Sequence, residues 1–209
     1  MTLGPLPNNV YLLGDNEIGD AVVIDPSFDS QLVLGRVEQL GWSLRQVWLT
    51  HAHFDHTAGA AVIANAFTPP LPVGLHPADR EWYEQDGGAG QFGMSIPELP
   101  DITIDFQHGQ ELPLHEGEES VARVRHAPGH SQGHVMFYCQ QLQSLFCGDV
   151  IFRGGIGRTD LNGGDYDTLM KSIYEQVLSL PAETRLLPGH GPESTVGFER
   201  RHNPFLQKL

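Results

Sequence analysis

Apolar and polar residues alternate between strand-like and helix-like patterns along the whole chain. Short apolar runs at residues 10–13 and 21–24 predict the two strands of a hairpin, with its turn at residues 14–19. Apolar residues at helical spacing between residues 32 and 40 predict a helix, which Gly41 ends. The chain therefore begins with a β-hairpin followed by a helix.

The same alternation continues to the end of the chain. Further elements are predicted as strands at 47–50 and 71–75 and as helices at 58–66 and 77–82. Short paired strands dominate residues 102–152. A last helical stripe, which ends before Pro181, consists of Tyr166, Leu169, Met170, Ile173, Val177 and Leu180. Two β-rich blocks flanked by helices predict a mixed α/β fold, and residues 1–209 are expected to form a single domain.

Residues 87–100 show no periodicity and are rich in glycine and proline. A structureless segment of this length inside a compact domain is typically either a functional lid or a mobile surface loop. We favour a flap that faces the substrate.

Composition is typical of a compact enzyme. With 209 residues, 40% of them hydrophobic, the chain is long enough for a large core, and no stretch approaches a membrane span. The first basic residue is Arg36, which is unlike a secretory signal, so a cytoplasmic location is expected. The two cysteines, Cys139 and Cys147, are expected to be reduced core-filling thiols rather than a disulfide across the hairpin at 135–146.

The net charge of -14 opposes nucleic-acid binding, which requires a basic surface. The expected partner is a small molecule, and the chain is expected to be a monomer or a small homo-oligomer. Bound divalent ions would still create a local cationic centre that attracts an anionic substrate.

A cluster of three histidines and one aspartate follows the apolar run 47–49. His51 and His53 alternate, so both side chains can point to one side as the chain leaves a strand, whereas Asp55 and His56 fall in the turn that opens the next helix. Imidazole and carboxylate groups together are typical ligands of transition metals. A solvated histidine-rich loop is the alternative, and it would be the better interpretation if this cluster stood alone.

Three later segments supply more ligand-type residues, each beside glycine and after an apolar stretch. They contain His130, Asp149 and His190. Loops at strand ends hold ligands in fixed geometry, and neighbouring glycines let the backbone turn sharply. Each segment alone could be an ordinary strand-to-turn junction. Together the seven residues suffice for two metal ions and a bridging water.

At this point the chain resembles the metallo-β-lactamase superfamily, whose motif is His-x-His-x-Asp-His followed by a later His, an Asp and a His. The resemblance covers nearly the whole chain. It is closest to small glyoxalase II-like hydrolases, through the stretches at 145–152, 154–160 and 188–207. It implies a four-layer αββα sandwich. It also implies one metal held by His51, His53 and His130, a second held by Asp55, His56 and His190, and Asp149 bridging the two.

This ligand set implies hydrolysis. Two divalent ions, with Zn expected first and Fe or Mn as alternatives, create hydroxide at neutral pH and polarise a carbonyl. Asp55 is expected to take part in catalysis as well as in metal binding. The resemblance implies a thioester substrate such as lactoylglutathione. Only 19 residues follow His190, so the C-terminal helical domain that holds glutathione in larger relatives is missing. The glutathione contacts of those relatives therefore do not carry over.

Arg153 and Arg158 lie in the glycine-rich loop that follows Asp149. The forked guanidinium of Arg158 is expected to bind a substrate carboxylate. The alternative is a structural salt bridge to Asp160 or Asp165.

Two other functions remain open from the sequence. The chain also resembles iron-dependent persulfide dioxygenases, which use one iron held by two histidines and an aspartate, here His51, His130 and Asp149. Members of that branch usually have a cysteine where this chain has His134, a residue for which we expect a structural role. A metal-binding protein without turnover is the third possibility, although purely structural zinc sites are closed and often rich in cysteine.

Overall fold

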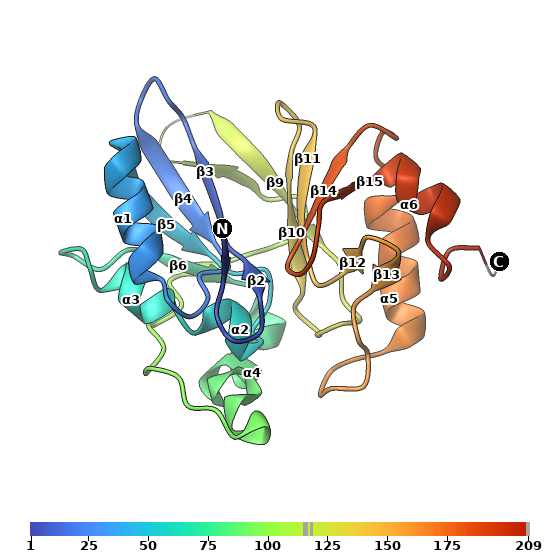
Figure 1. The fold of residues 1–209 in the computed structure, drawn as a ribbon, viewed down its shortest axis with the longest axis horizontal. Coiled ribbons are helices and arrows are strands. Elements are labelled where there is room, and N and C mark those ends of the chain that lie inside the picture. The colour runs from blue at the N-terminus through green and yellow to red at the C-terminus, as the bar shows by residue number, and fades with distance from the viewer. Residues whose placement is uncertain (115–116, 118, 208–209) are drawn as a thin grey trace.

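Two β-sheets face each other in the middle of the molecule, and helices cover the outer face of each sheet (Figure 1). The structure is a computed structural model, and it describes residues 1–114, 117 and 119–207. The layers follow in the order helix, sheet, sheet, helix. The predicted four-layer αββα sandwich is therefore confirmed.

The first sheet has five strands in the order β3-β4-β5-β6-β7. Its β3 and β4 form the predicted antiparallel hairpin, and the other neighbours are parallel. The strands are β3 (Tyr11–Gly14), β4 (Asp20–Ile24), β5 (Ser43–Trp48), β6 (Val73–Leu75) and β7 (Ile104–Asp105). Helices α1 (Gln31–Leu40) and α3 (Ala60–Ala64) lie on its outer face (Figure 1).

The second sheet has six strands in the order β15-β14-β11-β10-β9-β8. Only the pair β11 and β14 is parallel. The strands are β8 (Glu111–Pro113), β9 (Ser120–His126), β10 (Val135–Cys139), β11 (Ser144–Gly148), β14 (Arg185–Pro188) and β15 (Ser194–Thr195). Helix α5 (Tyr166–Ser172), its π-helical continuation η3 (Ile173–Val177) and α6 (Val196–His202) cover the outer face.

Short elements lie near the edge where the two sheets meet. Two small hairpins are formed by β1 (Thr2–Leu3) with β2 (Asn8–Asn9) and by β12 (Ile151–Phe152) with β13 (Gly155–Ile156). The helical pieces are α2 (Phe54–Thr57), η1 (Pro77–Asp79), α4 (Arg80–Glu84) and η2 (Asp86–Phe92).

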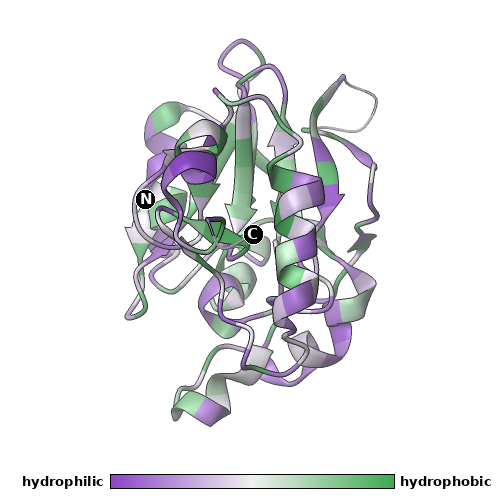
Figure 2. Cartoon of the chain, turned by 90° about the vertical axis from the view of Figure 1, so that its right-hand side faces the viewer, coloured by the Kyte–Doolittle hydropathy of each residue, from purple (hydrophilic) through white to green (hydrophobic). Residues whose placement is uncertain are grey.

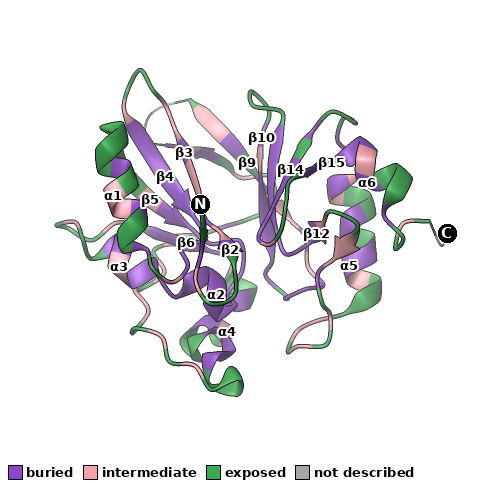
Figure 3. Cartoon of the chain, viewed as in Figure 1, coloured by how far each residue is buried: buried purple, intermediate pink, exposed green. Residues whose placement is uncertain are grey.

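Three apolar clusters hold the four layers together, as alternate strand residues point to opposite faces of a sheet. One lies between the first sheet and α1 and α3, one between the two sheets, and one between the second sheet and α5. Trp48 and Phe137 meet in the central cluster with ring centroids 5.2 Å apart. The buried strands and the exposed outer sides of the helices are plain in Figure 3, and Figure 2 shows the apolar strands behind α5.

The predicted elements are found with shifted boundaries. The strand predicted at 47–50 begins at Ser43 and ends at Trp48, so that Thr50 already lies beyond it. The helix predicted at 58–66 is shorter, at Ala60–Ala64, and a separate turn, α2, precedes it. Tyr166 of the last helical stripe is 46% exposed and lies outside the cluster that the other five residues of the stripe join.

Both cysteines are free and buried, as expected. Cys139 pairs with Ser144 in the β10–β11 register, and the two thiols belong to clusters on opposite faces of the sheet. Among the described residues, no helix is long and apolar enough to cross a membrane.

Candidate metal centre

The metal loop, residues 50–57, begins just beyond the carboxyl end of β5. The backbone N–H of Val135, at the start of β10, donates to Thr50 O at 2.8 Å and joins the two sheets at this edge. His51 and His53 lie side by side as expected, with 3.0 Å between His51 Nε2 and His53 Nδ1. Asp55 and His56 lie in the short helix α2, on the turn predicted for them. All four side chains are buried.

The other three predicted ligands follow the carboxyl ends of strands in the second sheet. His130 comes after β9, Asp149 after β11 and His190 after β14. Since β11 and β14 are parallel, their ends meet at one edge, and the backbone N–H of Gly189 donates to Gly148 O at 2.8 Å. Four loops from distant parts of the sequence thus converge where the two sheets adjoin.

The seven side chains form two groups joined at Asp149. His51, His53 and His130 make one triad, and Asp55, His56 and His190 make another, with ligand atoms in each within 4.8 Å of one another. Asp149 lies between them, with Oδ2 3.6 Å from both His130 Nε2 and His190 Nε2, and Oδ1 3.4 Å from His56 Nε2. These are the sets that the sequence resemblance implied.

Four of the five histidines are turned so that Nε2 faces the cluster, because an oxygen acceptor holds Nδ1–H on the other side. The acceptors are Thr50 Oγ1 for His51, Asp25 Oδ2 for His56, Arg158 O for His130 and Pro7 O for His190, at 2.8–3.0 Å. Carbonyl and carboxylate oxygens only accept, and the Thr50 hydroxyl gives its proton to Asp25 Oδ2, so its oxygen also accepts from His51. These partners therefore fix the tautomer that leaves Nε2 free to bind a metal.

The polar atoms at the centre of the cluster fit divalent ions. His53 Nε2, His56 Nε2 and Asp149 Oδ1 are buried without a hydrogen-bond partner among the described residues. Burial and the neighbouring His130 ring lower the pKa of His53 to about 3, and burial likewise lowers the pKa of His51 and His130. Buried lone pairs that converge without protons between them are costly unless a cation lies there.

The two carboxylates at the centre remain ionised. Burial alone would raise the pKa of Asp149, but the adjacent His56, together with His130 and His190, lowers it. The pKa of Asp55 is lowered in the same way by His56 and His190.

The neutral imidazoles of His51, His53 and His130 and the ionised carboxylates have the protonation states that metal ions require of these ligands. Burial alone would lower the pKa of His56 and His190, but the neighbouring carboxylates instead raise it, so a bound cation would have to displace a proton from these two rings.

Two buried carboxylates behind the ligands were not found from the sequence. Asp25, directly after β4, accepts from the N–H and the Oγ1–H of Thr50 and from His56 Nδ1. Asp79 accepts from Ala52 N, Ser131 Oγ and Gly133 N, and so joins the metal loop to the loop that carries His130. The position of Asp25 directly after the apolar run 21–24 could have indicated its role from the sequence. Nothing in the sequence around Asp79 indicates such a role.

His134 has a closer relation to the site than the structural role expected for it. Its Nε2 accepts from the backbone N–H of Asp149 at 3.0 Å, and its ring stacks on His51 at 4.7 Å. The residue is completely buried. It therefore supports two ligand residues directly.

A cavity of about 490 Å³, called here the metal cavity, opens over the cluster. His53, Asp55, His130, Asp149 and His190 form its polar floor. Its walls come from three places in the chain: the tip of the β1–β2 hairpin, the flap at residues 86–93 with the neighbouring aromatic residues, and the loop at residues 152–161. The wall residues are Leu6, Pro7, Phe54, Trp82, Gly87, Phe92, Phe152, Ile156, Arg158 and Leu161.

The segment predicted as a flap faces the cavity over its first part. Gly87, Gly88 and Ala89 are buried against the metal loop and Trp82, and Phe92 packs on Phe54 with centroids 5.4 Å apart. A Cβ at Gly87 would overlap Ala52 O, and φ there is +56°. This part of the segment is therefore packed in place and forms one wall of the cavity.

Arg158 lines the metal cavity and also forms the alternative salt bridge considered for it. Its Nε and Nη2 donate to the two carboxylate oxygens of Asp160 at 2.8 and 2.7 Å. Both side chains are at least half exposed, so the pair is solvent-screened.

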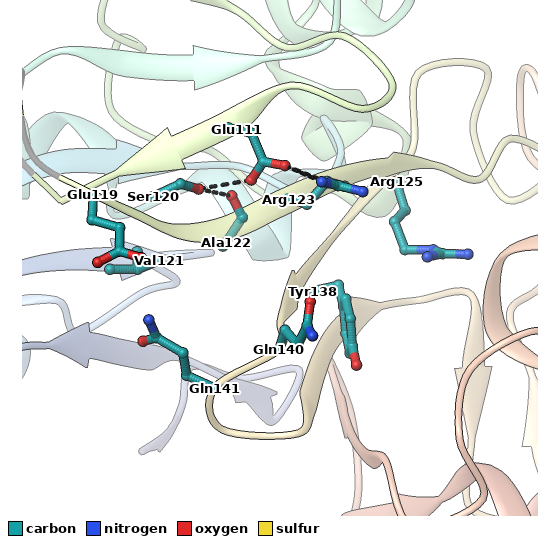
Figure 4. A pocket seen from close by; sticks show the side chains of 10 residues that line it. All are labelled: Glu111, Glu119, Ser120, Val121, Ala122, Arg123, Arg125, Tyr138, Gln140 and Gln141. Carbon is teal, nitrogen blue, oxygen red and sulfur yellow. Dashed lines mark hydrogen bonds and ion pairs between the residues drawn. The ribbon is translucent and has the colours of Figure 1, made fainter.

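A hollow of about 600 Å³ lies elsewhere, on the outer face of β8, β9 and β10 (Figure 4). Glu111 pairs with Arg123 across it, and Arg125 and Tyr138 stand beside them. None of the seven ligand residues lines this hollow. Its size alone does not make it a site.

Comparison with known proteins agrees with the geometry. Residues 3–190 match the model of the metallo-β-lactamase superfamily. The chain is 35% identical to the hydroxyacylglutathione hydrolase GloC of Haemophilus influenzae, over 95% of this chain and 92% of that protein. The chain therefore belongs to the metallo-β-lactamase superfamily, and it is a metallo-hydrolase.

Two solved structures are similar over almost their full length. One is TTHA1623 in a di-iron-bound form, with 42% identity, a TM-score of 0.89 and coverage of 99% of this chain and 98% of that one. The other is the B3 metallo-β-lactamase BLEG-1, with 36% identity, a TM-score of 0.90 and coverage of 98% and 97%.

Proposed function

We propose that the chain is a dinuclear metal-dependent thioester hydrolase of glyoxalase II type, which cleaves 2-hydroxyacylglutathione. The observation that carries the proposal is the pair of complete ligand triads joined at Asp149, on the floor of an open cavity. The similarity to GloC supports this substrate class.

The residues of the site suit this chemistry. A pair of bound divalent ions supplies a hydroxide nucleophile at neutral pH and a Lewis acid for the carbonyl. His51, His53 and His130 would hold one ion, Asp55, His56 and His190 the other, and Asp149 both. Asp55 has a second part in the proposal: its carboxylate lines the cavity, where it holds a proton or orients the attacking group.

The identity of the metal is part of the proposal. Histidine with carboxylate accepts Zn, Fe or Mn, and we propose Zn as the first candidate. TTHA1623 in its di-iron-bound form makes iron a direct competitor.

The complete second triad favours the dinuclear hydrolase over a persulfide dioxygenase with one iron. Asp55, His56 and His190 would have no role in a one-iron site, yet His56 is held by Asp25, His190 by Pro7 O, and Asp55 by His190 Nε2 at 3.1 Å. A protein that only stores or senses metal is disfavoured by the cavity, since structural sites are closed.

The proposed function is tested by comparing thioester and β-lactam hydrolysis. We expect measurable turnover of lactoylglutathione with weak saturation, because the lining of the metal cavity outside the ligand residues is mostly apolar and offers glutathione few polar partners. A β-lactam such as a cephalosporin is expected to be a poor substrate. Product thiol and ring opening are followed separately, with the chelated protein as the blank. Efficient β-lactam turnover beside an inert thioester would reject the proposal.

Arg158 is proposed as the contact for a substrate carboxylate. Arg158→Ala is expected to raise KM for lactoylglutathione about tenfold and to change kcat less, because this binding energy is shared by ground and transition states. The matched variant Asp160→Asn releases Arg158 from its partner and is expected to lower KM. A neutral thioester is the control, and equal losses with both substrates would make Arg158 a structural residue only.

A further inference from the structure

We propose that the metal cavity selects thioesters whose acyl group carries a bulky apolar substituent, such as a phenyl or branched alkyl group, next to the scissile carbonyl. This inference rests on the proposed thioester hydrolysis and narrows its substrate class. Phe92 is assigned as the main residue that determines this specificity.

The walls of the metal cavity are apolar on three sides. Leu6 comes from the β1–β2 hairpin, Phe92 from the flap, and Phe152 from the loop after the bridging aspartate, and all three line the same space as the ligand residues. Phe54, Trp82, Ile156 and Leu161 complete the surface between them. A concave apolar surface around a few polar groups is the usual form of a small-molecule site.

Two large apolar side chains at this cavity are left in contact with water. Phe92 is 47% exposed and Leu6 is 40% exposed, and they come from different walls of the cavity, the flap and the β1–β2 hairpin. Single exposed apolar residues need no explanation. Two that face one cavity above the candidate metal centre would stabilise a bound ligand that covers them, because their apolar surface is then removed from water. The methyl group of a lactoyl substituent is too small to reach both walls of a cavity of about 490 Å³.

The charges of the cavity place the apolar group on the acyl side of the thioester. Glutathione is a charged tripeptide, and the one arginine in the lining, Arg158, has a side chain that is half exposed to solvent. A charged thiol portion would lose water against Phe54, Phe92 and Phe152 without gaining polar partners. It therefore lies toward the exposed Arg158, and the acyl substituent meets the apolar walls.

The flap is fixed well enough to act as a selective wall. Gly87 packs on the backbone of the metal loop and Gly88 on Trp82, where a Cβ would lie 2.6 Å from Phe54 N and 2.5 Å from Trp82 Cζ2, respectively. Phe92 then packs on Phe54, which in turn meets Phe28 at 6.3 Å. The position of the Phe92 ring is therefore set by buried neighbours, and its free face is left for the substrate.

The experiment varies one end of the substrate at a time. Glycoloyl, lactoyl, 2-hydroxyhexanoyl and mandeloyl thioesters of glutathione are compared by kcat/KM, each divided by its rate of uncatalysed alkaline hydrolysis to remove differences in intrinsic reactivity. We expect the mandeloyl thioester to exceed the lactoyl thioester by roughly 10-fold to 100-fold, the range for burying a phenyl ring in place of a methyl group. Competitive inhibition by the free acids gives the same order without turnover.

The variants assign the preference to the wall. Phe92→Ala is expected to reduce the mandeloyl-to-lactoyl ratio about tenfold, and Phe92→Leu is expected to restore most of it. Phe205→Ala removes a phenyl ring of similar exposure that lies outside the cavity, so both substrates are expected to react as in the parent protein.

The outcomes separate this inference from the proposed function. Hydrolysis of all four thioesters at similar corrected rates, or faster hydrolysis of the glycoloyl and lactoyl thioesters, would overturn the apolar acyl pocket alone. A mandeloyl preference that survives in Phe92→Ala would overturn the assignment of Phe92. If none of the thioesters reacts, the proposed function itself fails.

Discussion

Asp149→Ala is expected to lose more activity than His190→Ala, and to lose both metal ions rather than one. Asp149 lies within 3.6 Å of ligand nitrogens from both triads, whereas His190 belongs to one triad only. We expect the parent protein to carry about two divalent ions per chain, His190→Ala about one, and Asp149→Ala fewer than one. Activity of Asp149→Ala is expected to fall well beyond the roughly 100-fold typical of removing a group behind the ligands.

Elemental analysis and turnover of the same preparations check this expectation. Both variants are expected to remain folded, because the three apolar clusters contain none of the ligand residues. Far-UV circular dichroism and thermal melting of the chelated proteins serve as the control. Equal and mild losses in the two variants would contradict the dinuclear mechanism, and a single tightly held iron in the parent protein would favour the dioxygenase.

The convergence of the candidate ligands could be predicted because these residue types are recognisable in the sequence. His51 and His53 follow an apolar strand at alternating positions, and His130, Asp149 and His190 each lie beside glycine after a strand. The carboxyl ends of β9, β11 and β14 lie at one edge of the second sheet, so these residues meet whatever the exact strand boundaries are. The pattern therefore survived errors of several residues in the predicted elements.

The groups behind the ligands could not be predicted in the same way. Pro7 O orients His190 and Arg158 O orients His130. Every residue has a backbone carbonyl, so the sequence does not show which carbonyls act as acceptors. Asp79 joins the metal loop to the loop that carries His130, and its role depends on where the short helix η1 places it. Only the tertiary structure brings these acceptors to the site.

The apolar residues of the cavity walls were not singled out, although the flap at residues 87–100 and Arg158 were predicted to face the substrate. Leu6, Phe92 and Phe152 look like ordinary apolar residues in the sequence, and each would fit a core as well as a pocket. Their exposure to one shared space is a property of three separate loops. The sequence therefore predicted the candidate ligands and a hydrolase, whereas the apolar cavity above these ligands became visible only in the structure.

Gly189→Ala is expected to inactivate the site without unfolding the protein. A Cβ at this position would overlap Asp149 Oδ1 and lie 2.6 Å from His56 Cε1. The flexible end of the Asp149 side chain is the group that can move away most easily, and it is also the proposed bridging ligand. We therefore expect loss of most of the bound metal and at least a 100-fold loss of activity, about the upper range for groups that position ligands.

Gly35→Ala is the matched control, because nothing lies within 4 Å of its added Cβ in helix α1. That variant is expected to keep its metals and activity and to gain about 0.5–1 kcal/mol of stability from the better helix propensity of alanine. Metal content, turnover and melting of the chelated proteins distinguish the two variants. Full metal binding by Gly189→Ala would mean that the Asp149 carboxylate can leave its observed position and still serve the metals, and the bridging geometry inferred from this structure would be wrong.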